Sequence, residues 1–202
     1  MSDRDWLGNR KSKYITLGAS NHTDKEREIN DFYATDPVAI DCLLDGGIEL
    51  SHNIWECACG QGHLSEALIA KGFEVKSTDV VDRGYGTPGV DFLLCDTKFD
   101  GDILTNPPYK YALEFVLHGL DLVPVHHKVV MFLKLQFLEG KQRRRLFDTK
   151  QLKTIYVFSS RILCAKNALF KEMREAGGSA VAYAWYEFEK GYHGDPIVKW
   201  IN

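Results

Sequence analysis

Residues 54–68 constrain the fold most, because an apolar, strand-like run leads through Gly60 and Gly62 into a helical pattern. Glycine adopts positive φ readily and lets a ligand approach the backbone closely, and the N–H groups at a helix start can hold a carboxylate. A second apolar run at 73–78 ends at Asp79, about 20 residues after the glycines, where an acid can bind ribose hydroxyls. This succession of strand, glycine turn, helix and strand predicts a nucleoside-binding half of an α/β sheet.

A nicotinamide-binding fold also has a glycine-rich turn between a strand and a helix, but its fingerprint is incomplete here. After Gly60 and Gly62 that fingerprint expects Gly or Ala at a position that is Ser65. The acidic Glu56 before the loop suits a cationic cofactor better than a pyrophosphate. The loop therefore favours a positively charged nucleoside cofactor over a dinucleotide.

The motif Asn106-Pro107-Pro108-Tyr109 follows the apolar run 102–105, where an open α/β sheet places its ligand crevice. The Asn106 side-chain oxygen and the Pro107 carbonyl can both accept hydrogen bonds from one planar amino group, and Tyr109 offers a ring for stacking. Holding both N–H bonds of a conjugated amino group returns lone-pair density to the nitrogen, so positioning supplies much of the rate. The alternative is a tight turn that only ends a strand, because Asn and Pro are ordinary turn residues.

Several blocks, in order along the chain, resemble class I S-adenosylmethionine-dependent methyltransferases, and specifically the branch that methylates the N6 amino group of adenine. These blocks are an aromatic-Thr-Pro segment at 32–37, the acidic and glycine-containing loop at 56–62, Asp79, Asp96, and the motif at 106–109. The chain also resembles small phage or prophage DNA adenine methyltransferases.

The resemblance implies a fold, a cofactor and residue roles. The fold is α/β, a single doubly wound and mostly parallel seven-strand sheet with a C-terminal antiparallel hairpin, and the cofactor is S-adenosyl-L-methionine. The implied cofactor-binding residues are Tyr33, Thr35, Glu56, Ala58, Gly60, Gly62, Asp79, Asp96 and Asn106, and the implied catalytic residues are Asn106, Pro107, Pro108 and Tyr109.

Within that set, the resemblance implies that the 32–37 segment holds the methionine end of the cofactor, Asp79 its ribose and Asp96 its adenine. It also implies that Asn106 and Pro107 orient the acceptor nitrogen and that Tyr109 stacks on the flipped base.

The whole chain agrees with one catalytic domain. A chain of 202 residues with 45% hydrophobic residues can bury one good core, which we place at 31–202. Residues 1–30 are polar and charge-mixed, and predict a flexible N-terminal arm. The net charge of −3 excludes a globally basic coat, so affinity for nucleic acid must come from local patches and be salt-sensitive.

The five cysteines are odd in number and sit mostly in apolar runs, which predicts reduced thiols in a cytoplasmic protein. Cys57 and Cys59 with His63 lack a second pair at metal spacing, so we expect no metal site. Apolar runs long enough for a signal peptide or a membrane span are absent from the sequence, so no membrane partner is expected.

The rest of the chain extends the alternating pattern. Helices are predicted at 111–122 and 140–148, and strands at 129–135, 154–158, 180–188 and 197–201. The last two strands are expected to pair antiparallel around a turn at 191–196, which gives the hairpin named above.

Other residues have both a functional and a structural interpretation. Lys141 and the run 143–145 could contact phosphates or only form a solvated helix face. Lys134 and Gln136 end a strand at the same edge as Asn106, so either could touch the substrate.

Three functions stay open at the level of sequence. The first is methylation of adenine N6 in nucleic acid, with DNA ahead of RNA and single strands easier than duplexes, because a duplex base must first be flipped out. The second is methylation of a protein glutamine amide, which presents the same pair of N–H donors. The third is a non-catalytic protein that binds S-adenosylmethionine. The oligomeric state and the recognition sequence are left open.

Overall fold

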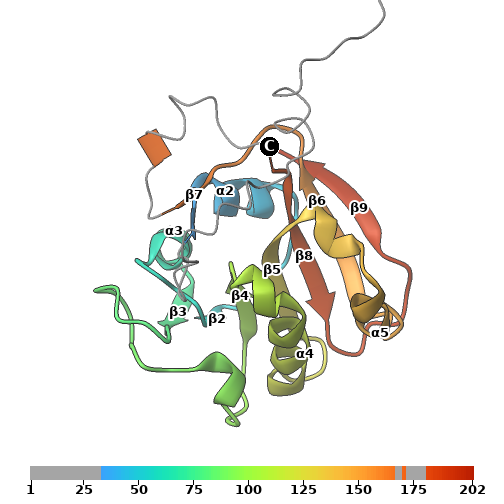
Figure 1. The fold of residues 1–202 in the computed structure, drawn as a ribbon, viewed down its shortest axis with the longest axis horizontal. Helices are drawn as coiled ribbons and strands as arrows, with labels where there is room; N and C mark the ends of the chain where they lie inside the picture. The colour runs from blue at the N-terminus through green and yellow to red at the C-terminus, as the bar shows by residue number, and fades with distance from the viewer. Residues whose placement is uncertain (1–32, 167–169, 172–180) are drawn as a thin grey trace, which may run out of the picture.

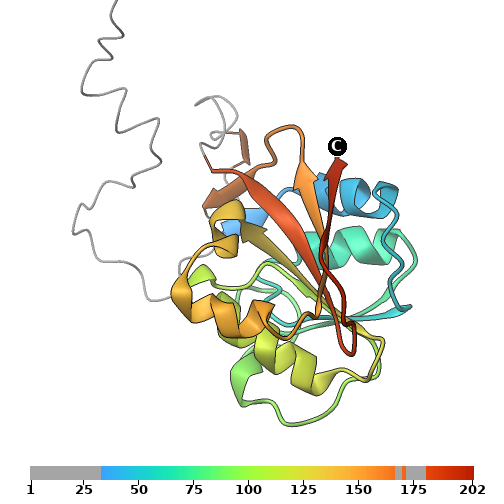
Figure 2. The same cartoon turned by 90° about the vertical axis from the view of Figure 1, so that its right-hand side faces the viewer.

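A computed structural model describes residues 33–166, 170–171 and 181–202. Seven strands form one sheet in the order β3-β2-β4-β5-β8-β6-β9, with helices on both faces (Figures 1 and 2). These strands are β2 (Asn53–Glu56), β3 (Glu74–Ser77), β4 (Asp102–Thr105), β5 (Lys128–Lys134), β6 (Leu152–Phe158), β8 (Tyr183–Glu189) and β9 (Ile197–Ile201). Every strand of this sheet except β8 runs in the same direction. The predicted doubly wound, mostly parallel α/β sheet is confirmed.

Helices cover the two faces of the sheet. The α-helices are α2 (Val38–Asp45), α3 (His63–Ala70), α4 (Ala112–Leu122) and α5 (Arg144–Phe147), and the short 3-10 helices are η1 (Phe92–Leu94), η2 (Tyr109–Tyr111), η3 (Leu135–Leu138) and η4 (Lys141–Arg143). Alternate residues of a strand point to opposite faces, and Val129 and Met131 of β5 pack with α4 and α5. Val130 and Phe132 pack with α2 and α3 on the other face.

The predicted C-terminal hairpin is wrong. Strand β8 lies between β5 and β6 and pairs antiparallel with both, whereas β9 pairs parallel with β6 at the edge of the sheet. Six consecutive residues of β8 are buried, because both of its faces are covered, while β9 is largely exposed. A strand buried on both faces belongs inside the sheet, and this burial prevails over pairing with its neighbour in sequence.

A second, two-stranded sheet joins distant parts of the chain. β1 (Tyr33–Thr35) pairs antiparallel with β7 (Cys164–Lys166), with Thr35 opposite Cys164. The backbone N–H of Asp36 extends this contact by donating to Leu163 O at 3.0 Å. The small sheet holds the start of the described chain against the segment that follows β6.

Some predictions fall outside the described residues, namely the arm at 1–30 and the first residue of the strand expected at 180–188. Within the part that is described, no helix combines the length and the apolar character needed to cross a bilayer.

Candidate active site

The glycine loop and the 106–109 motif lie at the same edge of the sheet. β2 and β4 are parallel neighbours, with Ile54 opposite Asp102 and Trp55 opposite Ile103. The glycine loop follows β2 and Asn106 follows β4, so both segments leave adjacent strands at their carboxyl ends. Open α/β sheets bind their ligands at this edge.

Asp79 secures the glycine loop. Gly60 and Gly62 have φ values of 55° and 85°, in the left-handed region that favours glycine. The two Asp79 carboxylate oxygens accept hydrogen bonds from the backbone N–H groups of Gly60 and Val81, each at 2.8 Å. A Cβ on Gly62 would lie 2.6 Å from the ring of Tyr85. The loop is therefore held by Asp79 on one side and packed against Tyr85 on the other.

Glu56 is buried below the loop. The Ser65 hydroxyl donates to Glu56 Oε2 and lies 2.7 Å from the Ser77 hydroxyl. Burial raises the pKa of Glu56 to about 8, and the Ser65 hydrogen bond offsets only part of that rise. The carboxyl is therefore mostly protonated at neutral pH when no cation lies beside it. Its observed contact is with the helix that follows the loop.

Replacing Glu56 with Gln should remove a pH-dependent destabilisation of the fold. The carboxyl titrates near 4.5 in the unfolded chain and at about 8 in the folded protein. The unfolded chain therefore loses this proton first, and stability falls as the pH rises between these two values. Because a pKa that differs by one between the folded and unfolded chain corresponds to about 1.4 kcal/mol, the variant should be more stable than the wild type by roughly 3–5 kcal/mol at pH 8 and by little at pH 4.5. Urea unfolding at a series of pH values measures the difference.

Glu66→Gln is the matched control, because Glu66 is an exposed carboxyl on the same helix α3. We expect it to lack the stability gain that Glu56→Gln shows at pH 8. A stability gain in Glu56→Gln of equal size at pH 4.5 and pH 8 would contradict a proton held by the buried carboxyl.

The small sheet orients the Asn106 side chain. Asn106 Nδ2 donates to the backbone carbonyl of Tyr33 at 2.9 Å and to the Thr35 hydroxyl at 3.0 Å, and it lies 3.6 Å from Cys164 Sγ. An amide nitrogen has two N–H donors, and both are accounted for by β1. The geometry therefore fixes which end of the amide is the oxygen, and leaves Oδ1 as the end available to accept.

The Pro107 carbonyl is a second acceptor, next to Asn106 in the chain. Within the described part of the protein, no hydrogen bond ends on the Pro107 carbonyl or on Asn106 Oδ1, whereas the Pro108 carbonyl accepts from the N–H of Tyr111 at 2.8 Å. Pro107 is buried and Pro108 is exposed. The motif thus presents two neighbouring oxygens without a described donor, as the sequence predicts for an amino-group trap.

Tyr109 is held by groups from four other elements. Its hydroxyl lies 3.2 Å from Cys164 Sγ, and its ring centroid lies 6.5 Å from that of Tyr33 and 6.1 Å from that of Tyr183. The Lys134 ammonium lies over the ring, 4.9 Å from its centroid. Burial raises the pKa of Tyr109 well above its ordinary value, so the phenol stays protonated at neutral pH.

Three further residues of the implied set have the following positions in the structure. Thr35 is buried and contacts Asn106, which is a contact to the acceptor residue and not to the glycine loop. Asp96 is exposed after η1 and accepts from the Thr97 hydroxyl at 3.4 Å. Ala58 is partly buried where the chain turns from β2 into the loop. These placements leave the cofactor roles of Thr35, Asp96 and Ala58 as predictions.

Sequence reasoning missed Cys164 and Tyr183 as neighbours of the motif. Both are buried and both contact Tyr109. Cys164 reaches the motif only because β7 pairs with β1, and three-residue strands so far apart carry no sequence signal of their pairing. Alternation along its strand favours core packing for Tyr183, and its stacking on Phe132 bears this out, with ring centroids 5.0 Å apart.

Two arginines of the basic run at 141–145 have partners within the protein. The Arg143 guanidinium donates to the backbone carbonyl of Gln136 at 3.0 Å and also to that of Glu139. Arg144 pairs with Asp148 at 2.6 Å, one helical turn away. These contacts brace the turn between η3 and α5.

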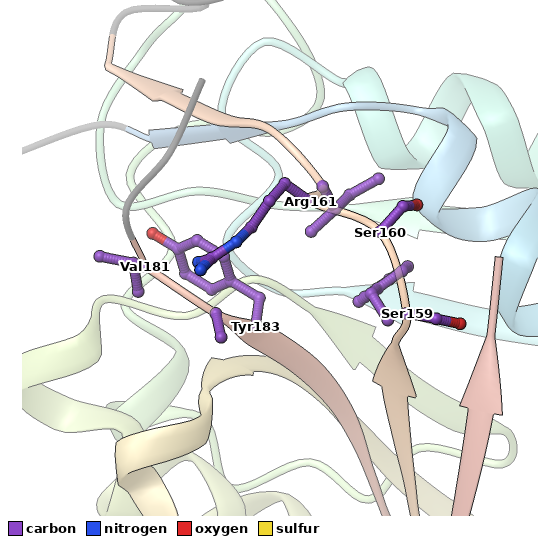
Figure 3. Close-up of a pocket in the computed structure, with 8 residues that line it drawn as sticks. Ser159, Ser160, Arg161, Val181 and Tyr183 are labelled. Carbon is purple, nitrogen blue, oxygen red and sulfur yellow. The ribbon is translucent and has the colours of Figure 1, made fainter. Parts of the chain in front are cut away.

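A pocket of about 210 Å³ lies beyond Tyr183, between the end of β6 and the start of β8. Figure 3 shows the Arg161 side chain extending across this pocket toward the ring of Tyr183. Tyr183 thus separates the pocket from Tyr109 and the acceptor motif.

All five cysteines are free thiols. Among the residues that the structure describes, no cluster of three or more His, Cys, Asp or Glu side chains could hold a metal ion.

No protein-family model and no curated protein matches this chain. Solved structures do match. The methyltransferase subunit of a type I restriction-modification system from Streptococcus thermophilus has a TM-score of 0.56 at 14% identity, over 80% of this chain and 45% of that one. A modification subunit of a putative type I restriction enzyme from Vibrio vulnificus has a TM-score of 0.57 at 12% identity, over 88% of this chain and 48% of that one.

A putative class I S-adenosylmethionine-dependent methyltransferase from Listeria monocytogenes has a TM-score of 0.53 at 13% identity, over 81% of this chain and 64% of that one. The chain spans about half the length of the two restriction subunits and less than two thirds of the Listeria protein. At these identities the likeness concerns the fold. Taken with the sheet order, it shows that this chain has the fold of class I S-adenosylmethionine-dependent methyltransferases.

Proposed function

We propose that this chain is an S-adenosylmethionine-dependent methyltransferase that acts on the N6 amino group of adenine in nucleic acid, with DNA ahead of RNA. The observation that carries the proposal is the orientation of the Asn106 amide. Its two N–H groups are bound by Tyr33 and Thr35, so Oδ1 and the neighbouring Pro107 carbonyl form a pair of acceptors. A pair of acceptors beside a partly exposed aromatic ring suits a planar group that carries an NH₂.

The residues at the adjacent strand fit the proposed cofactor. The glycines have the positive φ values that allow close approach to the backbone, and Asp79 holds them in place. Val80 and Leu94, which lie beside Asp79 and near Asp96 in sequence, expose 56% and 81% of their surface. Exposed apolar side chains beside acids suit an adenosine, whose base is apolar on its faces and whose ribose carries hydroxyls.

The protein groups contribute by position. S-adenosylmethionine supplies an electrophilic methyl on a sulfonium. Asn106 Oδ1 and Pro107 O each accept a hydrogen bond from the amino group, and these two bonds restore lone-pair density to the nitrogen that is methylated. Tyr109 stacks on the base and fixes the angle at which the nitrogen approaches. With the cofactor bound, the N–C bond would form as the S–C bond breaks, S-adenosylhomocysteine would be the leaving group, and the acceptor nitrogen would lose its extra proton to solvent.

The preference for DNA is supported by the kind of proteins that share the fold. Two of the similar structures are subunits of type I restriction-modification systems. This chain aligns with about half of each of them, so we expect its own choice of sequence to rest on short loops or on a partner.

The proposal is tested by incubating the protein with tritiated cofactor and four acceptors: single-stranded DNA, duplex DNA, RNA and lysate proteins. We expect label on DNA, more on single strands than on duplexes, and N6-methyladenine in the nucleoside digest. A labelled protein band without N6-methyladenine would favour the glutamine-amide function. A calorimetric binding signal for the cofactor without transfer to any acceptor would favour a non-catalytic binding protein.

A further inference from the structure

Lys134 lies beside the acceptor motif. It is the last residue of β5 and pairs with Tyr183 of β8, while Thr105 of the neighbouring β4 pairs with Met131 of β5. The end of β5 therefore lies at the same edge as Asn106. The Lys134 ammonium is 4.9 Å from the centroid of the Tyr109 ring, which places a positive charge next to the surface on which a base would stack.

The charge of Lys134 has no carboxylate partner among the described residues. Lys153, by contrast, pairs with Glu189 at 2.6 Å. Lys134 is partly buried, and its described contact is with the face of Tyr109, which stabilises a cation only modestly. A partly desolvated ammonium without a counter-charge favours the binding of an anion.

The proposed reaction gives a reason for an anion at this place. Methyl transfer moves positive charge from the sulfonium to the acceptor nitrogen, and an unneutralised ammonium nearby opposes that movement. A phosphate bound at Lys134 would neutralise the ammonium and so remove this repulsion. Of the candidate acceptors, a nucleotide carries an anion close to its base, whereas a nucleoside and a protein amide do not.

We propose that Lys134 binds a backbone phosphate next to the adenine that stacks on Tyr109, so that the substrate is a nucleotide within a polymer. This inference rests on the proposed function. The polymer is favoured over a free nucleotide because a second cation follows on the same rim. Arg161 extends toward the ring of Tyr183 (Figure 3), across the pocket of about 210 Å³ between the end of β6 and the start of β8. Lys134 beside the partly exposed Tyr109, and the exposed Arg161 beyond the buried Tyr183, thus place two cations along one rim, which suits a strand that carries more than one phosphate.

The test compares the wild type with Lys134→Met in the full chain, using salt dependence as the main measurement. Binding of a fluorescent, adenine-containing single-stranded oligonucleotide is measured by anisotropy from 50 to 200 mM salt, with S-adenosylhomocysteine present. Each phosphate contact on a single strand contributes about 0.7 to the slope of log affinity against log salt. We expect the slope of Lys134→Met to be shallower by about that amount, its affinity at 100 mM salt to be about tenfold lower, and Lys134→Arg to keep the wild-type slope.

Lys199→Met is the matched control. Lys199 also lies over a tyrosine ring, 5.3 Å from the centroid of Tyr156, but it belongs to β9 at the far edge of the sheet. Lys199→Met removes the same charge and the same type of ring contact as Lys134→Met. Because Lys199 lies far from the acceptor motif, the variant should keep the wild-type salt slope and the wild-type affinity for the oligonucleotide. Thermal melting of all three variants checks that they are folded.

Methyl transfer to three acceptors separates the phosphate role from a structural one. Lys134→Met should lower transfer to the oligonucleotide about tenfold more than transfer to deoxyadenosine, which has no phosphate and shares only the contact with Tyr109. Transfer to deoxyadenosine monophosphate should fall less in Lys134→Met than transfer to the oligonucleotide. An equal fall would mean that Lys134 binds the phosphate of a free nucleotide, and would overturn the polymer substrate.

An unchanged salt slope in Lys134→Met would overturn the phosphate contact, even if the wild type methylates DNA. An equal loss on deoxyadenosine and oligonucleotide would show that Lys134 only supports Tyr109, and would also overturn it. Failure of the proposed function looks different, because the wild type would then transfer no methyl to any adenine-containing acceptor.

Discussion

Asn106→Ala should lower methyl transfer by about a hundredfold to a thousandfold while S-adenosylmethionine affinity changes by less than about twofold. The side chain donates away from the acceptor, to Tyr33 and Thr35, and its oxygen is the group that we assign to the amino hydrogens. Removing the side chain should therefore lower the rate of methyl transfer much more than the affinity for the cofactor. Transfer rates with tritiated cofactor and calorimetric affinities measure the two effects separately.

Thr35→Val is the companion variant, since valine keeps the shape of threonine and removes the hydroxyl that accepts from Asn106. One N–H of the amide then loses its partner, and we expect transfer to fall about tenfold because the amide is held less firmly. A loss of cofactor affinity equal to the loss of transfer in Asn106→Ala would contradict the placement of the amide at the acceptor. A loss mainly of cofactor affinity in Thr35→Val would instead restore Thr35 to its implied role at the methionine end.

Asp79→Ala should weaken S-adenosylmethionine binding by about tenfold to a hundredfold and lower the thermal stability as well. The implied role of Asp79 is to bind the ribose. The structure adds a supporting role, because the carboxylate accepts hydrogen bonds from the N–H groups of Gly60 and Val81. Its removal leaves the buried N–H of Gly60 without its partner, which is destabilising in a loop that depends on a left-handed backbone. Calorimetry and thermal melting measure the two losses.

Asp82→Ala is the matched control, because the exposed Asp82 carboxylate also accepts from the N–H two residues later, at 3.0 Å from Gly84. Asp82→Ala removes the same kind of local turn contact, but the Asp82 carboxylate makes no described bond to the glycine loop. We expect its cofactor affinity to equal that of the wild type. Preserved affinity in Asp79→Ala would mean that neither the loop support nor the ribose contact matters for binding.

The candidate site is built from two kinds of contact, local and distant. The glycine loop and its acid come from adjacent strands, whereas the Asn106 amide depends on β1 and β7, the small sheet that joins residues 33–35 to 164–166. A change in the small sheet should therefore affect the acceptor side first. This separation explains why Thr35 and Cys164 surround the catalytic motif even though they lie far from it in sequence.

The sequence by itself determined the elements that follow from local patterns. The strand before the glycines, the positive φ values at Gly60 and Gly62, and the strand ending before Asn106 all appear where the residues predict them. Strand β9 even keeps its predicted limits at 197–201. Hydrophobic periodicity and glycine chemistry act over a few residues, so they can be read without a structure.

Only the tertiary structure decided which strands are neighbours and which side chains meet at the rim. The strand order is β5-β8-β6-β9, and not the expected hairpin of the last two strands. Strand β8 is buried on both faces and therefore takes a place between two other strands, which residues close to it in sequence could not supply. The same long-range packing buried Glu56 until its pKa rose, turned the Asn106 oxygen away from β1, and brought Lys134 over Tyr109. These features arise from contacts between distant segments, and the energies of such contacts are not encoded in any short stretch of the chain.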